Sequence, residues 1–241
     1  MDHTAFDDPA PRLGLFGYGA FGRLVALGLR DRARIVVHDP APAAAARAAA
    51  DGFALGDAAE VAGCPIVVLA VPVAALEDCL RAIAGLVRPG ALVADVGSVK
   101  EGPARLMAAI LPPGVSVLAT HPLFGPASLG AGLRGGRVVL CPVRGEWRGV
   151  ARALRGLGLR AIRRTPEAHD REVALTQGVV HMVARMLGGI EGGTPLATRS
   201  YEALAAALAM VRDDPPELVA AILEGNAHVA PLRARLRAAL G

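Results

Sequence analysis

The sequence is poor in aromatic residues, cysteine and lysine, and each shortage excludes a class of protein. Phe, Trp and Tyr make up 3% of the 241 residues, and the arginines are scattered through both halves of the chain. The net charge of +4 therefore does not indicate nucleic-acid binding, which requires clustered basic residues. The cysteines, which are Cys64, Cys79 and Cys141, are odd in number and widely spaced. This pattern argues against a disulfide framework and predicts reduced thiols in a cytoplasmic protein.

Long hydrophobic runs are also missing. No stretch of roughly 18 uncharged apolar residues, the length that spans a bilayer, occurs in the chain. The start, MDHTAFDDPAPR, is acidic and lacks the basic and then apolar pattern of a signal peptide. We therefore expect a globular protein with no membrane partner and no export signal, long enough for one standard domain and one small domain.

Short apolar runs alternate with helical patterns over the first two thirds of the chain. Such alternation predicts an α/β domain with a parallel, doubly wound sheet of Rossmann type. The expected helices are at 18–29, 41–50, 73–85, 101–111 and from about 147. The expected strands are at 12–17, 34–40, 52–54, 64–72, 91–97, 115–122, 136–142 and 159–164.

The remainder of the chain is predicted to be helical. Three helices are expected at 167–189, 196–212 and 215–239, with prolines near their starts. We place the boundary near 165, which gives an NAD-binding domain over residues 1–165 and a small helical domain over 166–241. The apolar stripes of these helices need a cover, so we expect a homodimer built through them.

A glycine-rich turn stands between the first expected strand and the first expected helix. It reads Gly17-Tyr18-Gly19-Ala20-Phe21-Gly22 and has the G-x-G-x-x-G spacing of dinucleotide-binding folds. The first glycine allows a tight turn, the second lets backbone approach the pyrophosphate, and the third lets helix and strand pack closely. This motif predicts a dinucleotide cofactor.

Asp39 closes the second expected strand, 20 residues after Gly19. A carboxylate there can accept hydrogen bonds from both ribose hydroxyls and repels a 2′-phosphate, which favours NAD over NADP. The alternative is that Asp39 is only a turn residue at a strand end. Ala70, Val71 and Pro72 follow the fourth long strand and are expected to lie against the cofactor, although they also fit an ordinary proline-terminated buried strand.

Two other strand ends carry reactive side chains. DVGSVK (95–100) contains Ser98 and Lys100, the only lysine beside 25 arginines, and THPLFGP (120–126) contains His121. Ligands of doubly wound sheets gather at the carboxyl ends of the strands. An imidazole with a pKa near about 6.5 can take a proton from a substrate hydroxyl. We expect His121 to be such a base, with Ser98 hydrogen-bonded either to the substrate hydroxyl or to the imidazole.

Lys100 has three possible explanations. It anchors the loop that presents Ser98, or it places a compact positive charge near a substrate carboxylate. Alternatively, it is a chance survivor in an arginine-biased sequence.

Three motifs together resemble the prephenate/arogenate dehydrogenase family of tyrosine biosynthesis. They are DVGSVK, THPLFGP and EAHDREVALTQGVVHMVAR (167–185), and the resemblance covers roughly residues 12–235. TPLATRSYEAL (194–204) is especially similar to plant-type arogenate dehydrogenases and their bacterial relatives. The resemblance implies a metal-free, NAD(P)-dependent oxidative decarboxylation, which we expect to convert prephenate to 4-hydroxyphenylpyruvate with NAD. Hydride leaves C4 of the ring, the C4 hydroxyl loses its proton and the ring carboxylate leaves as CO2.

The resemblance also assigns roles to single residues. His121 becomes the base that polarises the hydroxyl, Ser98 its hydrogen-bonding companion, and His181 a residue of the substrate pocket. His169 and Gln177 lie 12 and 4 residues before His181, spacings that we take to bring the three near one helix face. Either His169 contacts the site or it braces the start of its helix.

An arginine is the natural partner of a substrate carboxylate. Arg199 best matches the family residue, and Arg185 is a second candidate.

Other readings of the site stay open. Arogenate or 4-amino-4-deoxyprephenate is the alternative substrate, because the distinguishing pocket residues cannot be placed from the sequence. A catalytically silent NAD-binding sensor is the alternative from another class, and His121 and Ser98 argue against it.

Overall fold

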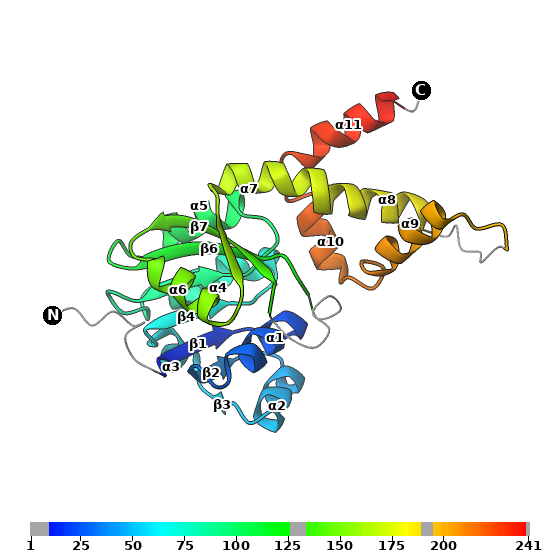
Figure 1. Ribbon diagram of the computed structural model, residues 1–241. Helices are drawn as coiled ribbons and strands as arrows, with labels where there is room; N and C mark the ends of the chain where they lie inside the picture. Colours follow the sequence, from blue (N-terminus) through cyan, green and yellow to red (C-terminus); the bar gives the residue numbers. More distant parts are fainter. Residues whose placement is uncertain (1–9, 126–133, 189–194, 240–241) are drawn as a thin grey trace.

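The computed structural model describes residues 10–125, 134–188 and 195–239 of the protein (Figure 1). Pro126 and Thr194, which belong to two of the motifs quoted above, lie outside the described residues. A sheet with helices packed around it occupies one side of the molecule, and a group of helices from the last third of the chain extends away from it.

The central sheet has eight strands in the order β3-β2-β1-β4-β5-β6-β7-β8. Strands β1 to β6 are all parallel to one another, as a Rossmann-type sheet requires. The strands are β1 (Arg12–Phe16), β2 (Arg34–His38), β3 (Ala54–Leu55), β4 (Ile66–Leu69), β5 (Leu92–Asp95), β6 (Ser116–Pro122), β7 (Arg137–Arg144) and β8 (Arg160–Arg163). The predicted fold class is confirmed.

The prediction of a wholly parallel sheet was wrong at one edge. Strand β7 runs antiparallel to β6, and β8 is parallel to β7. The apolar run 136–142 indicated burial, but burial on both faces carries no information about strand direction. Strands β6 and β7 follow one another in the chain and pair directly, and an antiparallel pair needs no crossover connection, whereas a parallel pair does.

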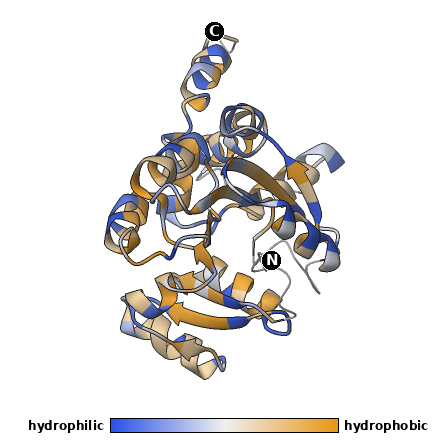
Figure 2. Cartoon of the chain, turned by 90° about the vertical axis from the view of Figure 1, so that its left-hand side faces the viewer, coloured by the Kyte–Doolittle hydropathy of each residue, from blue (hydrophilic) through white to orange (hydrophobic). Residues whose placement is uncertain are grey.

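Helices cover both faces of the sheet and bury two hydrophobic cores. Alternate residues of each central strand point into opposite cores, as Val67 and Val68 of β4 do. Figure 2 shows the strands as hydrophobic along most of their length. One face carries α1 (Ala20–Leu29), α2 (Pro42–Ala50) and α6 (Arg148–Gly156). The other carries α3 (Ala58–Ala62), α4 (Leu76–Ile83), preceded by the short 3₁₀ helix η1 (Val73–Ala75), and α5 (Glu101–Ile110).

A long helix leads away from the sheet into the helical region. It consists of α7 (Pro166–Val173), the π-helical segment η2 (Ala174–Gly178) and α8 (Val179–Leu187). The side chain of Thr165 caps its start, two residues after β8 ends at Arg163. The boundary near 165 proposed from the sequence lies at this junction. Helices α9 (Arg199–Ala209), α10 (Pro216–Leu223) and α11 (Val229–Ala239) complete the region.

The prediction of a single helix at 215–239 was wrong, because the helix is interrupted between α10 and α11. At Gly225 the backbone turns so closely that a Cβ would stand 2.6 Å from the carbonyl oxygen of Ala221. The Asn226 side chain then accepts a hydrogen bond from the amide of His228 and donates one to the carbonyl oxygen of Asp170. The buried Asn226, hydrogen-bonded to helix α7, therefore interrupts the helix that the apolar pattern alone predicted to continue to residue 239.

The helical region buries only a small core of its own. Its members are Ala174, Met182, Ile222, Leu223 and Val229. Several large apolar side chains remain exposed, including Leu175, Met186, Tyr201, Leu204 and Met210. Within the described ranges, no helix has both the length and the apolarity needed to cross a membrane.

Candidate active site

The glycine-rich turn has the steric features that its motif predicted. Gly17 has a φ of +91°, and a Cβ there would stand 2.5 Å from the carbonyl oxygen of Ala70. A Cβ on Gly22 would stand 2.1 Å from the carbonyl oxygen of Gly17. A Cβ on Gly19 would meet nothing within 4 Å. The first and third glycines are therefore required by the fold, whereas the second leaves open space in front of the backbone.

That open space lies at the start of α1. Gly19 is the N-cap of this helix, and no side chain caps the first turn. Uncapped amides at a helix N-terminus attract phosphate groups. Ala20 at this end is exposed, and the half-buried Phe21 packs near Phe124 with ring centroids 6.5 Å apart. The turn thus fits the pyrophosphate of a dinucleotide.

Tyr18 contributes its backbone to this turn and not its ring. The side chain is fully buried against Phe53, and its hydroxyl donates to Asp51 Oδ2 at 2.9 Å. Burial, together with the hydrogen bond to Asp51, raises the pKa of Tyr18 to about 12. The phenol therefore stays neutral, and its buried ring and its hydrogen bond to Asp51 hold the turn in place.

Asp39 lies beside the turn, as predicted, and contacts it directly. Its Oδ2 accepts a hydrogen bond from the amide of Tyr18 at 2.6 Å, and its Oδ1 accepts one from the amide of Ala41 at 2.9 Å. The carboxylate thus shapes the turn and stays partly exposed at the end of β2. Each carboxylate oxygen has a second lone pair, so acceptor capacity is left for ribose hydroxyls.

The segment Ala70-Val71-Pro72 borders the same turn. The amide of Ala70 donates to the carbonyl oxygen of Phe16, and its own carbonyl is the group closest to Gly17. Val71 packs on the core under α4 and α5, while Pro72 is exposed. The segment is therefore both the end of a buried strand and one wall of the cofactor-binding edge.

Lys100 is fully buried and forms an ion pair between two strand ends. Its ammonium pairs with Asp95 at the end of β5 and donates to the carbonyl oxygen of Thr120 in β6 at 2.6 Å. Asp95 also accepts hydrogen bonds from the amides of Gly97 and Thr120. With both partners buried and engaged with each other, the geometry favours the anchoring role of Lys100 over contact with a substrate.

His121 lies at the end of β6 and is 2% exposed. Its Nδ1 is 2.8 Å from Nε2 of His169, and Nδ1 of His169 is 2.7 Å from Oδ1 of Asp170. His169 and Asp170 belong to α7, so the helical region supplies the partners of a side chain of the sheet. Burial, and then the neighbouring His169 and Lys100, hold the pKa of His121 well below 6.5. The imidazole is therefore a neutral group at physiological pH.

Ser98 is buried in the loop after β5. Among the described residues its hydroxyl has no hydrogen bond to His121, whose Nδ1 is occupied by His169. The role of Ser98 toward a substrate hydroxyl stays a prediction. His169 contacts the imidazole of His121, and its role toward a substrate also stays a prediction.

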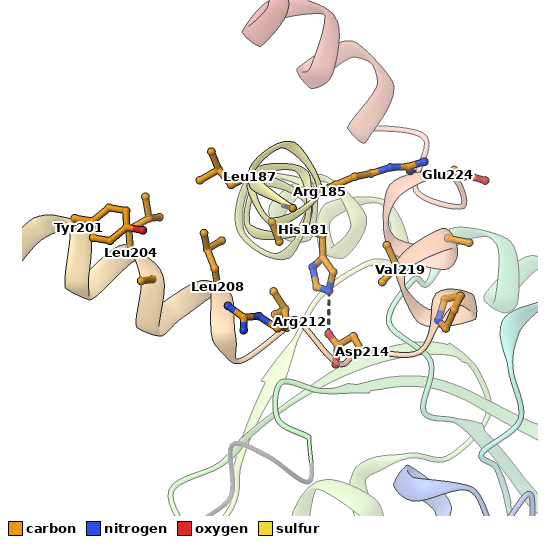
Figure 3. Close-up of a pocket in the computed structure, with 16 residues that line it drawn as sticks. His181, Arg185, Leu187, Tyr201, Leu204, Leu208, Arg212, Asp214, Val219 and Glu224 are labelled. Carbon is orange, nitrogen blue, oxygen red and sulfur yellow. Dashed lines mark hydrogen bonds and ion pairs between the residues drawn. The ribbon is translucent and has the colours of Figure 1, made fainter. Parts of the chain in front are cut away.

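His181 lies in a separate pocket of the helical region. This pocket, of about 810 Å³, lies between α8, α9 and α10 (Figure 3). The imidazole has Nδ1 2.8 Å from the carbonyl oxygen of Gln177 and Nε2 3.0 Å from Oδ2 of Asp214. Arg212 also lines the pocket. His121, Ser98 and Lys100 are not among the residues that line this pocket.

The two predicted carboxylate-binding arginines differ in their relation to the pocket of His181. Arg199 begins α9, is exposed, and does not line this pocket. Arg185 lines it but is largely exposed, with Glu224 at 3.8 Å. The Gln177 side-chain oxygen is buried and has no hydrogen-bond partner among the described residues.

Sequence reasoning missed Asp170, Arg212 and Asp214. The adjacent pair His169-Asp170 in EAHD was the available signal for the first of these, since a carboxylate next to a histidine commonly orients it. Arg212 and Asp214 stand in an irregular turn before α10, where no periodic pattern marks them. No group of three or more metal-ligating side chains occurs in the part of the chain that the structure describes.

The fold and this edge of the sheet define a nucleotide-binding domain of Rossmann type with a helical extension. A family model described as the nucleotide-binding domain of prephenate dehydrogenase matches residues 25–162. The chain therefore belongs to the prephenate dehydrogenase family. The glycine-rich turn lies just before the matched residues.

Named relatives fall within the same group. A probable arogenate/prephenate dehydrogenase of Methanocaldococcus jannaschii is 31% identical over 68% of this chain and 39% of its own length. Arogenate dehydrogenase 1 of Arabidopsis thaliana is 32% identical over 81% of this chain and 33% of its own length. A 4-amino-4-deoxyprephenate dehydrogenase of Streptomyces pristinaespiralis is 33% identical over 67% of this chain and 50% of its length. The chain thus spans a third to a half of these relatives.

Solved structures share the fold over almost the whole chain. Prephenate dehydrogenase of A. aeolicus, in complex with hydroxyphenyl propionate and NAD+, aligns with a TM-score of 0.77 at 21% identity, covering 95% of this chain and 88% of that one. Arogenate dehydrogenase of Synechocystis aligns with a TM-score of 0.74 at 20% identity, covering 95% and 89%. Both alignments include the helical region as well as the sheet.

The glycine geometry predicts opposite effects for two matched substitutions. Gly22→Ala forces a methyl group onto the Gly17 carbonyl and should lower the free energy of unfolding by about 1–3 kcal/mol, the usual cost of overpacking. Gly19→Ala has room and a φ of −65°, so it should keep the stability but weaken dinucleotide binding. Thermal unfolding and titration with NAD measure the two effects. Equal loss of stability in both variants would contradict this assignment.

The buried ion pair predicts a large effect of neutralising Lys100. Lys100→Met leaves the Asp95 carboxylate buried without its cation and should lower the free energy of unfolding by roughly 3–5 kcal/mol. Arg81→Met, which breaks the exposed Arg81–Glu77 pair of α4, is the control and should cost less than about 1 kcal/mol. Urea unfolding compares the two. A Lys100→Met protein as stable as the control would show that the pair does not hold the two strand ends.

Proposed function

We propose that the protein catalyses the NAD-dependent oxidative decarboxylation of prephenate to 4-hydroxyphenylpyruvate in tyrosine biosynthesis. The observation that carries the proposal is the buried, neutral His121 at the carboxyl end of β6, on the edge of the sheet that also bears the glycine-rich turn. A neutral imidazole at that edge is suited to take the proton of a substrate hydroxyl. Membership of the family supports the same reaction.

The protein's own part in the reaction is to position the ring and to remove one proton. When bound, the nicotinamide accepts the hydride from ring carbon C4. His121 takes the proton of the C4 hydroxyl, which becomes a carbonyl. The C–C bond to the ring carboxylate then breaks and releases CO2, its electron pair makes the ring aromatic, and the carbonyl oxygen takes the proton back from His121 to become a phenol. Because aromatisation makes the sequence strongly downhill, orientation and proton acceptance are the contributions required of the residues. We assign Ser98 to orient the hydroxyl.

The cofactor is held by the residues of the glycine-rich turn. The uncapped start of α1 faces the pyrophosphate, and the Ala70-Val71-Pro72 segment lies along the adjacent edge. Asp39 accepts the ribose hydroxyls with its remaining lone pairs, and its charge disfavours a 2′-phosphate. NAD is accordingly the proposed cofactor.

Arogenate is the second candidate substrate. The match to the Arabidopsis arogenate dehydrogenase extends over 81% of the chain and so includes at least part of the helical region. Arogenate carries an ammonium where prephenate carries a keto group, while the reacting ring is the same. Gln177 and His181 are the proposed pocket residues and Arg199 the proposed carboxylate ligand. Arg212 lines the pocket of His181, whereas Arg199 does not.

A homodimer through the helical region accompanies this function. The pocket between α8, α9 and α10 is lined by apolar side chains, among them Leu187, Leu204 and Leu208. Tyr201 and Leu204 on α9 are more than 40% exposed. Such a surface is typical of a subunit interface.

The proposed activity is tested by NADH formation with prephenate and with arogenate. We expect turnover with prephenate that His121→Asn lowers by roughly 10²–10⁴-fold, with little change in NAD affinity. Because the pKa of His121 is held well below 6.5, kcat/KM should stay level from pH 8 to about 6.5 and fall only below that, as the base is protonated. Turnover with arogenate alone would make arogenate, and not prephenate, the substrate of the protein. Activity with neither would support a silent NAD-binding sensor.

Asp39 predicts the choice of cofactor. Asp39→Ser removes the charge that repels a 2′-phosphate, so the ratio of kcat/KM for NAD over that for NADP should fall. Steady-state kinetics with both cofactors measures the ratio, and thermal unfolding verifies that the turn is still folded. An unchanged ratio would mean that Asp39 serves only to hold Tyr18 and Ala41.

A further inference from the structure

We propose that His169 and Asp170 are positioning residues that hold His121 in one tautomer, with the proton on Nδ1 and a free lone pair on Nε2. The assignment of Nε2 as the acceptor of the substrate proton rests on the proposed function. The tautomer itself follows from the hydrogen bonds of the free protein.

The carboxylate of Asp170 is surrounded by hydrogen-bond donors. Oδ1 accepts a hydrogen bond from the amide of Lys100 at 2.7 Å, and Oδ2 accepts one from the amide of Glu101 at 2.9 Å. These two amides open helix α5, where the helix dipole stabilises a negative charge. Asp170 is therefore an acceptor on both oxygens. The nitrogen 2.7 Å from Oδ1, which is Nδ1 of His169, must carry a proton.

The direction of the next hydrogen bond follows from the chemistry of imidazole. A neutral imidazole has one N–H and one acceptor nitrogen. We take His169 as neutral, so its one N–H points toward Asp170 and its Nε2 is an acceptor. That acceptor lies 2.8 Å from Nδ1 of His121, which must then be the donor. His121 is left with an unprotonated Nε2.

The charges around the pair bear on the same assignment. The Lys100 ammonium, itself paired with Asp95, lies near His121 and disfavours a second proton on it. The Glu101 carboxylate lies farther out, 2.8 Å from Nε2 of His228 just before α11. A second proton on His169 would reverse the direction of the bond to His121 and turn its Nε2 into a donor, which would abolish its use as a base.

The arrangement makes the base dependent on the docking of the helical region. His169 and Asp170 are 1% and 2% exposed on α7, and the carbonyl of Asp170 accepts a hydrogen bond from the Asn226 side chain. Asp170 thus contacts α5 through its carboxylate and the start of α11 through its carbonyl. These contacts leave His169 and Asp170 little freedom to change position.

The tautomer is measured directly by ¹⁵N NMR of histidine-labelled protein without substrate. The chain has six histidines, and His121→Asn assigns the signal of interest. We expect a protonated Nδ1 and an unprotonated Nε2 on His121 at pH 7.5. A proton on Nε2, or a mixture of both tautomers, would overturn the inference. Because no turnover is involved, this result is independent of whether prephenate is the substrate.

A kinetic comparison separates positioning from simple packing. His169→Gln can place an amide oxygen near the former Nε2 and accept from His121, whereas His169→Leu fills the space without an acceptor. We expect His169→Leu to lower kcat by roughly 10- to 100-fold, the usual effect of losing a partner that orients a functional histidine, with KM little changed.

His169→Gln should recover a large part of that loss, and circular dichroism verifies that both variants fold. Equal losses in the two variants, or a wild-type kcat in His169→Leu, would contradict the positioning role. If both proteins and the wild type are inactive, the proposed reaction is wrong, and the NMR result still decides the tautomer.

Discussion

The ion pair between Lys100 and Asp95 is the contact on which the rest of the site depends. It fixes the loop after β5 against β6, and that loop starts helix α5. Burying two charges is costly unless each is paired and hydrogen-bonded, and here the carboxylate also receives the amides of Gly97 and Thr120. A planar guanidinium requires more room than an ammonium between two strands. This explains why one lysine persists in a sequence that otherwise uses arginine.

A second carboxylate, Asp170, joins the two regions of the molecule at the same place. It accepts the first amides of α5 and faces His169, so one side chain both caps a helix and orients an imidazole. Helix α5 is thereby held at its start from the sheet side by Lys100 and from the helical side by Asp170. The reactive edge is consequently shared between the regions and belongs to neither alone.

The parts that could be predicted from the sequence are those governed by local rules. Glycine positions in a tight turn, an aspartate at a strand end and a histidine carried to the rim by an apolar run depend on near neighbours in the chain, and Gly17, Asp39 and His121 lie where expected. The contact of His121 with His169 depends on how α7 docks across 48 residues of sequence. The direction of β7 and the break at Asn226 depend on partners that no hydropathy pattern encodes.

The π-helical segment between α7 and α8 sets the angle around the helix axis between His169 and His181. Twelve residues separate His169 from His181, and in an uninterrupted α-helix that spacing amounts to about three and a third turns, which would leave the two side chains a third of a turn apart. A π-bulge absorbs one residue, so the same stretch behaves as about three full turns. The spacing that looked favourable in the sequence is therefore favourable only because of segment 174–178. The one extra residue of the π-bulge changes the angle between the two side chains around the helix axis. A relative without the bulge would need a different spacing to place both imidazoles on one face of the helix.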